Sequence, residues 1–210
     1  YLPEIENLEE LGVTELVYYP VLEKILEETL TVSRFRHTLG VMYTAGALAM
    51  KYGVDLDQAM PAGLLHDCAK CLPVEEQKNL CKEYSISLSE SEEKNPALIH
   101  AKLGAYLAKS KYGVTDEDVL SAIMYHTTGR PDMTMLEKIL YIADYIEPGR
   151  HHAENLSFVR RLAFEDINKA ILQVSGDILN YLLENRNSVI DALTKETYEF
   201  YRNQLELEGK

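Results

Sequence analysis

Apolar residues recur along most of the chain three or four positions apart, which is the spacing of one face of an α-helix. Residues 15–31 are an example, with Leu22, Ile25, Leu26 and Leu30 on a single face. Runs in which apolar and polar residues alternate, as in a half-buried strand, are missing. The pattern predicts an all-α protein, with one helix following Asp55 and others over 15–31, 33–52, 73–84, 96–111, 115–127, 133–147, 156–185 and 188–207.

Residues that favour helix ends support several of these boundaries. Ser33 and Thr115 are suited to cap the helices that follow them, and Asp55 is suited to cap the third helix. Gly53 is suited to end the second helix, because glycine adopts the left-handed conformation that closes many helices. The polar run SISLSESEEKN, residues 85–95, is predicted to be a loop.

We expect one helical domain flanked by two smaller segments. A chain of 210 residues is long enough for one sizeable core, and it contains no internal repeat or low-complexity linker. The predicted division is an acidic N-terminal segment over 1–17, a helical bundle over 18–187, and a C-terminal helix over 188–210 that packs on the bundle or extends from it. Helix faces rich in Tyr and Leu near the C-terminus are compatible with a homodimer.

The net charge of −13 limits the partners of this protein. An acidic chain is poorly suited to bind nucleic acid or an anionic membrane surface, and the sequence contains no run of apolar residues long enough to span a membrane. The first residues lack the basic and apolar regions of a signal peptide. The cysteines, Cys68, Cys71 and Cys81, do not form the pattern of a disulfide framework. We therefore expect a cytoplasmic protein that binds neither nucleic acid nor membranes.

Imidazole and carboxylate side chains lie inside apolar helical runs. His66 and Asp67 follow the run Ala-Gly-Leu-Leu. Asp144 lies within a second apolar run, and His37 lies in the second predicted helix. A buried carboxylate is unfavourable unless something compensates its charge. A satisfied core histidine, or an ion pair with Arg or Lys, is the ordinary explanation of each residue alone. Together they favour a metal site, since imidazole and carboxylate bind iron, manganese and zinc, and bundles build such sites from facing helices.

The order of these residues resembles the HD superfamily of metal-dependent phosphohydrolases. The likeness extends over roughly residues 30–185, and it is closest to the YqeK family of bacterial symmetrical diadenosine tetraphosphate hydrolases. It rests on the strings SRFRHTLGV, AGLLHDCAK, NPALIHAKLGA, AIMYHTTGRPDM and KILYIADYIEPGR. The histidine–aspartate dyad alone indicates only the superfamily, whereas IADYIEPGR together with YHTTGRPDM is more specific. The resemblance implies a single HD domain with the architecture of a helical bundle.

The resemblance also implies His37, His66, Asp67 and Asp144 as metal ligands. Iron is the expected metal, with manganese, cobalt, zinc or magnesium as substitutes. Such an ion lowers the pKa of a bound water and polarises phosphorus, which gives a hydroxide nucleophile near neutral pH. Asp67 is expected to act on that water as well, either as a general base or as a hydrogen-bond acceptor.

Two roles stay open for His100 and His126. They bind a second metal ion, with Asp67 as the bridging ligand, or they contact substrate phosphates beside a single ion. Phosphate contact is the role that we favour from the sequence, and His37 is expected to lie against the substrate as well.

Cationic and hydroxyl residues near these motifs are candidates for substrate binding. Lys70 lies one helical turn after the histidine–aspartate dyad, and Arg150 follows the helix that carries the second aspartate. Both are expected to stabilise charge on a transferring phosphoryl group, and Lys70 is also counted as catalytic. Thr127 and Arg130 are further candidates, although Thr127 is equally suited to cap a helix end and Arg130 to face solvent.

The activity implied by the resemblance is symmetrical hydrolysis of diadenosine tetraphosphate to two ADP. Another HD-type phosphohydrolase, acting on nucleoside monophosphates or deoxynucleoside triphosphates, is the nearest alternative, and a substrate panel separates the two. A di-iron oxygenase would consume oxygen. A non-catalytic nucleotide-binding module is the last alternative, and the four intact candidate ligands argue against it.

Overall fold

The computed structural model of the chain describes residues 15–151, 155–184 and 189–208. Every regular element in these ranges is helical, which confirms the all-α prediction. The elements are α1 (Glu15–Thr29), α2 (Val32–Tyr52), α3 (Leu56–Leu65), α4 (Val74–Glu83), α5 (Glu90–Lys94), the 3₁₀ turn η1 (Pro96–Leu98), α6 (Ile99–Ser110), α7 (Glu117–Tyr125), α8 (Met135–Ile146), α9 (Leu156–Glu165), α10 (Ile167–Glu184) and α11 (Ala192–Glu208).

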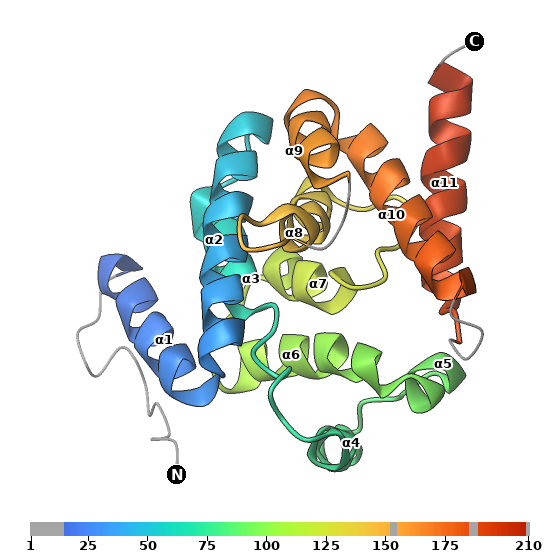
Figure 1. Ribbon diagram of the computed structural model, residues 1–210. Coiled ribbons are helices and arrows are strands. Elements are labelled where there is room, and N and C mark those ends of the chain that lie inside the picture. The colour runs from blue at the N-terminus through green and yellow to red at the C-terminus, as the bar shows by residue number, and fades with distance from the viewer. Residues whose placement is uncertain (1–14, 152–154, 185–188, 209–210) are drawn as a thin grey trace.

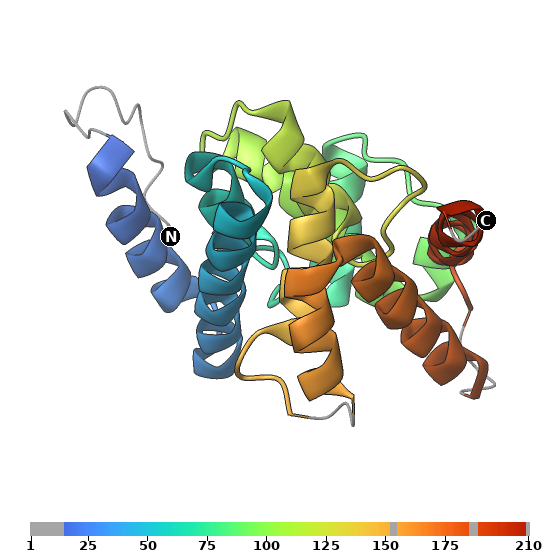
Figure 2. The same ribbon diagram turned by 90° about the horizontal axis from the view of Figure 1, so that it is seen from above.

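Four helices form the centre of the bundle. α2 packs on α3 and α8, and α7 also packs on both of these helices, so the four close into a ring. α6 packs on α7, while α10 packs on α8 and carries α11 on its other side. Figures 1 and 2 show α1 and α11 at opposite edges of the molecule, with the ring between them. The ring buries large apolar side chains, including Leu64, Leu65, Ile123, Ile139 and Leu140.

The helices α2, which carries His37, and α3, which ends directly before His66 and Asp67, meet at a glycine. A methyl group at Gly63 of α3 would lie only 2.6 Å from Cα of Met42 in α2. Because a real Cβ atom almost never lies so close to a backbone atom, only glycine permits this approach of α2 and α3. The approach brings the C-terminal end of α3 against the middle of α2.

Several predicted helix ends are found and others are displaced. Gly53 ends α2 in the left-handed conformation, and Asp55 caps α3 with its side chain. The predicted cap Ser33 is wrong: Thr31 caps α2 by accepting the backbone N–H of Arg34 at 3.3 Å. Ser33 lies inside the first turn instead.

The loop predicted over 85–95 contains the short helix α5. Its N-terminus has a capping box, in which the Ser89 hydroxyl accepts the Glu92 N–H and the Glu92 carboxylate accepts the Ser89 N–H. A similar shift occurs before α7, where Asp116 and not Thr115 is the cap. Glu92, which the polar pattern assigned to a loop, and Asp116, which it assigned to a first helical turn, are therefore both part of a helix cap.

The helix predicted over 156–185 is two helices. The backbone is extended at Asp166, between α9 and α10, and the Asp166 carboxylate accepts the Lys169 N–H at 3.1 Å. The predicted segment 1–17 lies largely outside the described residues, and so does the boundary predicted at 187–188. Within the described ranges, no helix combines the length and hydropathy of a bilayer-spanning segment.

Candidate metal centre

Six predicted side chains converge where the central helices meet. His37 lies in α2 and Asp144 lies in α8, near its C-terminal end. His66 and Asp67 directly follow α3, His100 lies in the first turn of α6, and His126 directly follows α7. Helix ends therefore supply most of the cluster, as expected when a bundle builds a polar site in its core.

Three of the four imidazoles are aligned by the same local bond. In each, Nδ1 donates a hydrogen bond to the backbone carbonyl three residues earlier, and this bond fixes the proton on Nδ1. The bonds measure 2.7 Å and join His66 to Gly63, His100 to Ala97, and His126 to Ile123. In the neutral ring, Nε2 then carries a lone pair that is free to bind a cation.

A first group of ligand atoms joins His37, His66 and Asp67, with Asp144 beside them. His37 Nε2 lies 3.0 Å from Asp144 Oδ1, and His66 Nε2 lies 3.3 Å from Asp67 Oδ2. The remaining cross-distances are 3.8 Å from His37 to Asp67 and 4.0 Å from His66 to Asp144. Neither Nε2 makes a hydrogen bond of proper geometry with any described residue, although both are buried. Two lone pairs aimed at two carboxylates are the donor set that a divalent cation requires.

A second group joins His100, His126 and the same Asp67. Asp67 Oδ1 lies 3.1 Å from His100 Nε2 and 3.8 Å from His126 Nε2. The two Nε2 atoms lie 3.2 Å apart. Because each ring has its proton on Nδ1, two lone pairs face each other at this distance, and only a cation or a proton between them relieves the repulsion. Asp67 thus turns one oxygen to each group.

Burial and neighbouring charge set the ionisation of the cluster. Burial raises the pKa of Asp67, but in the metal-free protein, where a proton on Nε2 takes the place of a cation, the charge of His66 and the hydrogen bond from His100 outweigh this and hold the pKa of Asp67 well below its usual range. Burial likewise opposes ionisation of Asp144, whereas His37 and His66 lower its pKa strongly. Burial lowers the pKa of His126 to about 3, so this ring is neutral. Two carboxylates and a neutral imidazole are therefore available to a metal at neutral pH.

Three cationic side chains contact the cluster. Arg34 Nη1 lies 2.6 Å from Asp67 Oδ2, and Arg150 Nη2 lies 2.8 Å from Asp144 Oδ1. Lys70 Nζ lies 3.2 Å from His100 Nδ1. Burial lowers the pKa of Lys70. The sequence predicted that Lys70 and Arg150 lie near the metal ligands. It did not predict Arg34, although Arg34 precedes His37 by three residues and therefore lies on the same helical face.

A cleft of about 840 Å³ opens onto the first group. It is lined by Val32, Ser33, Arg34, Arg36, His37, Gly40 and residues 147–150. Three of these side chains, from Arg34, Arg36 and Arg150, are guanidinium groups. The cleft is therefore positive although the protein as a whole is acidic, which suits a polyanionic ligand.

Glu147 is a second residue that the sequence reasoning missed. Its buried carboxylate lies 3.1 Å from His37 Nδ1 and accepts the Gly149 N–H at 2.5 Å. A carboxylate on the far nitrogen of a ligand histidine orients the ring and raises its basicity. The signal in the sequence is its position three residues after Asp144, but the pairing with α2 is visible only in three dimensions.

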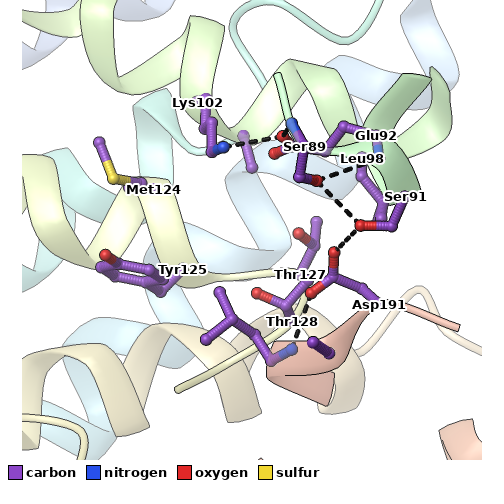
Figure 3. Close-up of a pocket in the computed structure, with 13 residues that line it drawn as sticks. Ser89, Ser91, Glu92, Leu98, Lys102, Met124, Tyr125, Thr127, Thr128 and Asp191 are labelled. Carbon is purple, nitrogen blue, oxygen red and sulfur yellow. Dashed lines mark hydrogen bonds and ion pairs between the residues drawn. The ribbon is translucent and has the colours of Figure 1, made fainter. Parts of the chain in front are cut away.

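The structure does not bring Thr127 and Arg130 into the cluster. Thr127 lines a separate cavity of about 180 Å³, in which Ser91 donates a hydrogen bond to Asp191 (Figure 3). Arg130 forms a bidentate ion pair with the buried Glu137, at 3.0 and 2.9 Å. None of its polar contacts with the described residues reaches the cluster, because its guanidinium already satisfies a buried carboxylate.

Comparisons with known proteins agree with this architecture. The family model described as HD domain matches residues 34–149. A Bacillus subtilis protein named "Bis(5'-nucleosyl)-tetraphosphatase, symmetrical" is 43% identical over 164 residues, which cover 78% of this chain and 87% of that protein. A protein of the same name from Halalkalibacterium halodurans is 41% identical over 187 residues, covering 89% and 96%.

A solved structure shares the fold as well. It is a crystal structure from Clostridium acetobutylicum, described as a predicted HD superfamily hydrolase involved in NAD metabolism. The two chains are 40% identical and superpose with a TM-score of 0.84 over 89% of this chain and 97% of the other. The matched region carries every side chain of the two ligand groups, and the chain belongs to the HD domain family.

Proposed function

We propose that this protein is a metal-dependent hydrolase that cleaves diadenosine tetraphosphate symmetrically into two ADP. The observation that carries the proposal is a cluster of histidines and aspartates at an arginine-lined cleft. The relatives named symmetrical bis(5'-nucleosyl)-tetraphosphatase support the substrate, since they match most of this chain.

The metal ligands in this proposal are His37, His66, Asp67 and Asp144. His100 and His126 would hold a second ion together with Asp67, and the shared carboxylate and the facing Nε2 atoms support this role over phosphate contact alone. Iron is the proposed metal, because mixed imidazole and carboxylate ligands suit it, and manganese, cobalt, zinc or magnesium are substitutes. When bound, the metal supplies a hydroxide nucleophile and polarises phosphorus.

The reaction consumes one water molecule. The water oxygen bonds to one inner phosphorus, and the bond from that phosphorus to the central bridging oxygen breaks, so each product is ADP. Asp67 is ionised at neutral pH, because its pKa is held far below that of a useful base. It therefore acts as the hydrogen-bond acceptor that orients the attacking water.

The cationic side chains bind and stabilise the phosphates. Lys70, Arg34 and Arg150 lie against the ligand residues and face phosphates at the reacting centre. Their charge stabilises the oxygens on which negative charge grows as the central bond breaks. Arg36 extends the same positive surface along the cleft.

We also propose the domain boundaries, the cellular location and the partners of the protein. The proposed catalytic unit extends over 18–187, and α11, the helix of the C-terminal segment, packs on α10 of this unit. The protein works in the cytoplasm, since its three cysteines are all free thiols. Its acidic net charge disfavours nucleic acid and membranes as partners, whereas the arginine-lined cleft supports a small nucleotide, and a homodimer is the proposed assembly.

Product analysis tests this function. The iron-loaded protein is incubated anaerobically with diadenosine tetraphosphate, and nucleotides are resolved by ion exchange while metal content is measured on the same sample. We expect ADP as the sole product and loss of both activity and metal in Asp67→Asn. Asp177→Asn is the matched control and should keep full activity, because within the described residues Asp177 accepts hydrogen bonds only from Tyr145, Asn155 and Gln173.

Other products would revise the proposal. AMP plus ATP would overturn the cleavage position and keep the metal hydrolase. An inactive, metal-bound protein would overturn the substrate, and turnover of nucleoside monophosphates or deoxynucleoside triphosphates would then identify another phosphohydrolase. Oxygen uptake would identify an oxygenase, and binding without any turnover would identify a non-catalytic module.

A further inference from the structure

Arg34 connects the ligand cluster to the cleft. Its guanidinium lies 2.6 Å from Asp67 Oδ2, and its side chain is 31% exposed, whereas the Asp67 side chain is only 4% exposed. Arg34 also lines the cleft together with Arg36 and Arg150. The same side chain thus contacts a buried carboxylate and is also partly exposed in the cleft.

The oxygen that Arg34 contacts is the one on which the first group converges. Asp67 Oδ2 lies 3.3 Å from His66 Nε2 and 3.8 Å from His37 Nε2. A metal ion held by these three atoms would lie a few ångströms from the guanidinium, and two positive charges at that distance in a buried site repel each other. Arg34 and the metal therefore compete for the charge of Asp67.

The cleft offers Arg34 an alternative partner. A planar guanidinium binds phosphate oxygens in a bidentate manner, and its long side chain can turn without movement of the helix. We infer that Arg34 is an exchange cation: it ion-pairs with Asp67 in competition with metal, and it turns to substrate phosphate once metal takes Asp67. This inference rests on the metal site of the proposed function but not on the identity of the nucleotide.

The first test measures metal affinity. Mn²⁺ is titrated into the wild-type protein, Arg34→Gln and Arg36→Gln by calorimetry. Both variants remove one guanidinium from the cleft, but none of the described contacts of Arg36 is with a ligand carboxylate. Losing the competing charge-assisted hydrogen bond should make Mn²⁺ bind about tenfold more tightly to Arg34→Gln than to Arg36→Gln.

The second test measures phosphate binding with and without metal. Inorganic phosphate is the probe, because it binds Mn²⁺ weakly in solution and is not turned over. With Mn²⁺ present, Arg34→Gln should bind phosphate about tenfold more weakly than the wild-type protein. Without Mn²⁺, the two should bind phosphate equally, because Asp67 then engages Arg34. Arg36→Gln should weaken phosphate binding by the same factor in both conditions.

Three outcomes would overturn the inference. These are equal Mn²⁺ affinity in the two variants, weakened phosphate binding in Arg34→Gln without metal, and no dependence of its phosphate affinity on metal. Thermal melting checks folding, and Arg34→Lys, which keeps the charge, should lie between Arg34→Gln and the wild type in Mn²⁺ affinity. A wild-type protein that binds no Mn²⁺ would instead overturn the metal-dependent function, so the two failures are distinguishable.

Discussion

The close approach of α2 and α3 makes Gly63→Ala a test of how the fold sets the site. The added methyl group would lie 2.6 Å from Met42 Cα and 3.0 Å from Met42 N. Both are backbone atoms, so no side-chain rotation relieves the contact, and α3 must move away from α2. That movement separates His37, on α2, from His66 and Asp67 at the end of α3.

Two opposing effects set the magnitude. Replacing glycine with alanine inside a helix stabilises it by about 0.5–1 kcal/mol. Overpacking of a tight core costs about 1–3 kcal/mol. Because the contact is with backbone, the upper part of that range applies, and we expect a net loss of about 1–2 kcal/mol. For a chain of this length, the melting temperature should fall by about 2–8 °C, and the affinity for metal by about tenfold, as when a supporting contact of a ligand is lost.

Differential scanning calorimetry and metal titration check both numbers. Gly46→Ala is the matched control, because its methyl group would lie 3.4 Å from Cγ of the flexible Met60 side chain, and its melting temperature should stay equal or rise. If Gly63→Ala melts with the wild type and binds metal equally well, the contact of α2 with α3 does not position the ligands, and the reasoning is refuted.

Three further predictions concern single residues of the site and its surroundings. Glu147→Gln should lower metal affinity about 10–100-fold by weakening the orienting bond to His37; an unchanged affinity in a metal titration would contradict this role. Burial holds the pKa of His126 at about 3 in the folded, metal-free protein, whereas the same ring has a pKa of about 6.5 in the unfolded chain. The unfolded chain therefore binds the proton first as the pH falls, and the free energy of unfolding decreases from about pH 6.5 toward pH 3. Between pH 7.5 and 5.5 the wild type should lose about 1.4 kcal/mol more than His126→Asn in urea melts, and equal losses would argue for an open, solvated ring. Arg130→Ala should lower stability by about 1–3 kcal/mol, because the buried Glu137 carboxylate loses its cationic partner and keeps only the hydrogen bonds from Ser121 and the Thr134 backbone within the described residues. Loss of turnover at unchanged melting temperature would instead place Arg130 against substrate.

The helical pattern was visible in the sequence because most helices have one buried face. The exceptions were local. The polar residues of α5 carry no apolar periodicity, and only the capping pair Ser89 and Glu92 marks that helix. The break at Asp166 lies between two segments that share the same period, so periodicity alone joins them into one helix.

The candidate ligands were also predictable, because a histidine or aspartate inside an apolar run is conspicuous. Arg34 was less so, since arginine on a helix is usually solvated, and its partner Asp67 is 33 residues away. Glu147 lies 110 residues from His37, and no local pattern joins them. Arg130 was predicted from its place in a turn, whereas its ion pair with Glu137 depends on how that turn folds onto α8.

The alignment of the imidazoles has a consequence for the mutational robustness of the site. His66, His100 and His126 are each held by a carbonyl of the main chain, and a side-chain substitution at Ala97 or Ile123 leaves that acceptor in place. Gly63 is the exception, because its close contact with the Met42 backbone permits no side chain. His37 is held by the side chain of Glu147, which a single codon change removes. Random variation should therefore disturb the orientation of His37 through a second residue more often than that of His100 or His126. A library screened for folded variants with weakened metal binding should accumulate substitutions at Glu147 and few at Ala97 and Ile123.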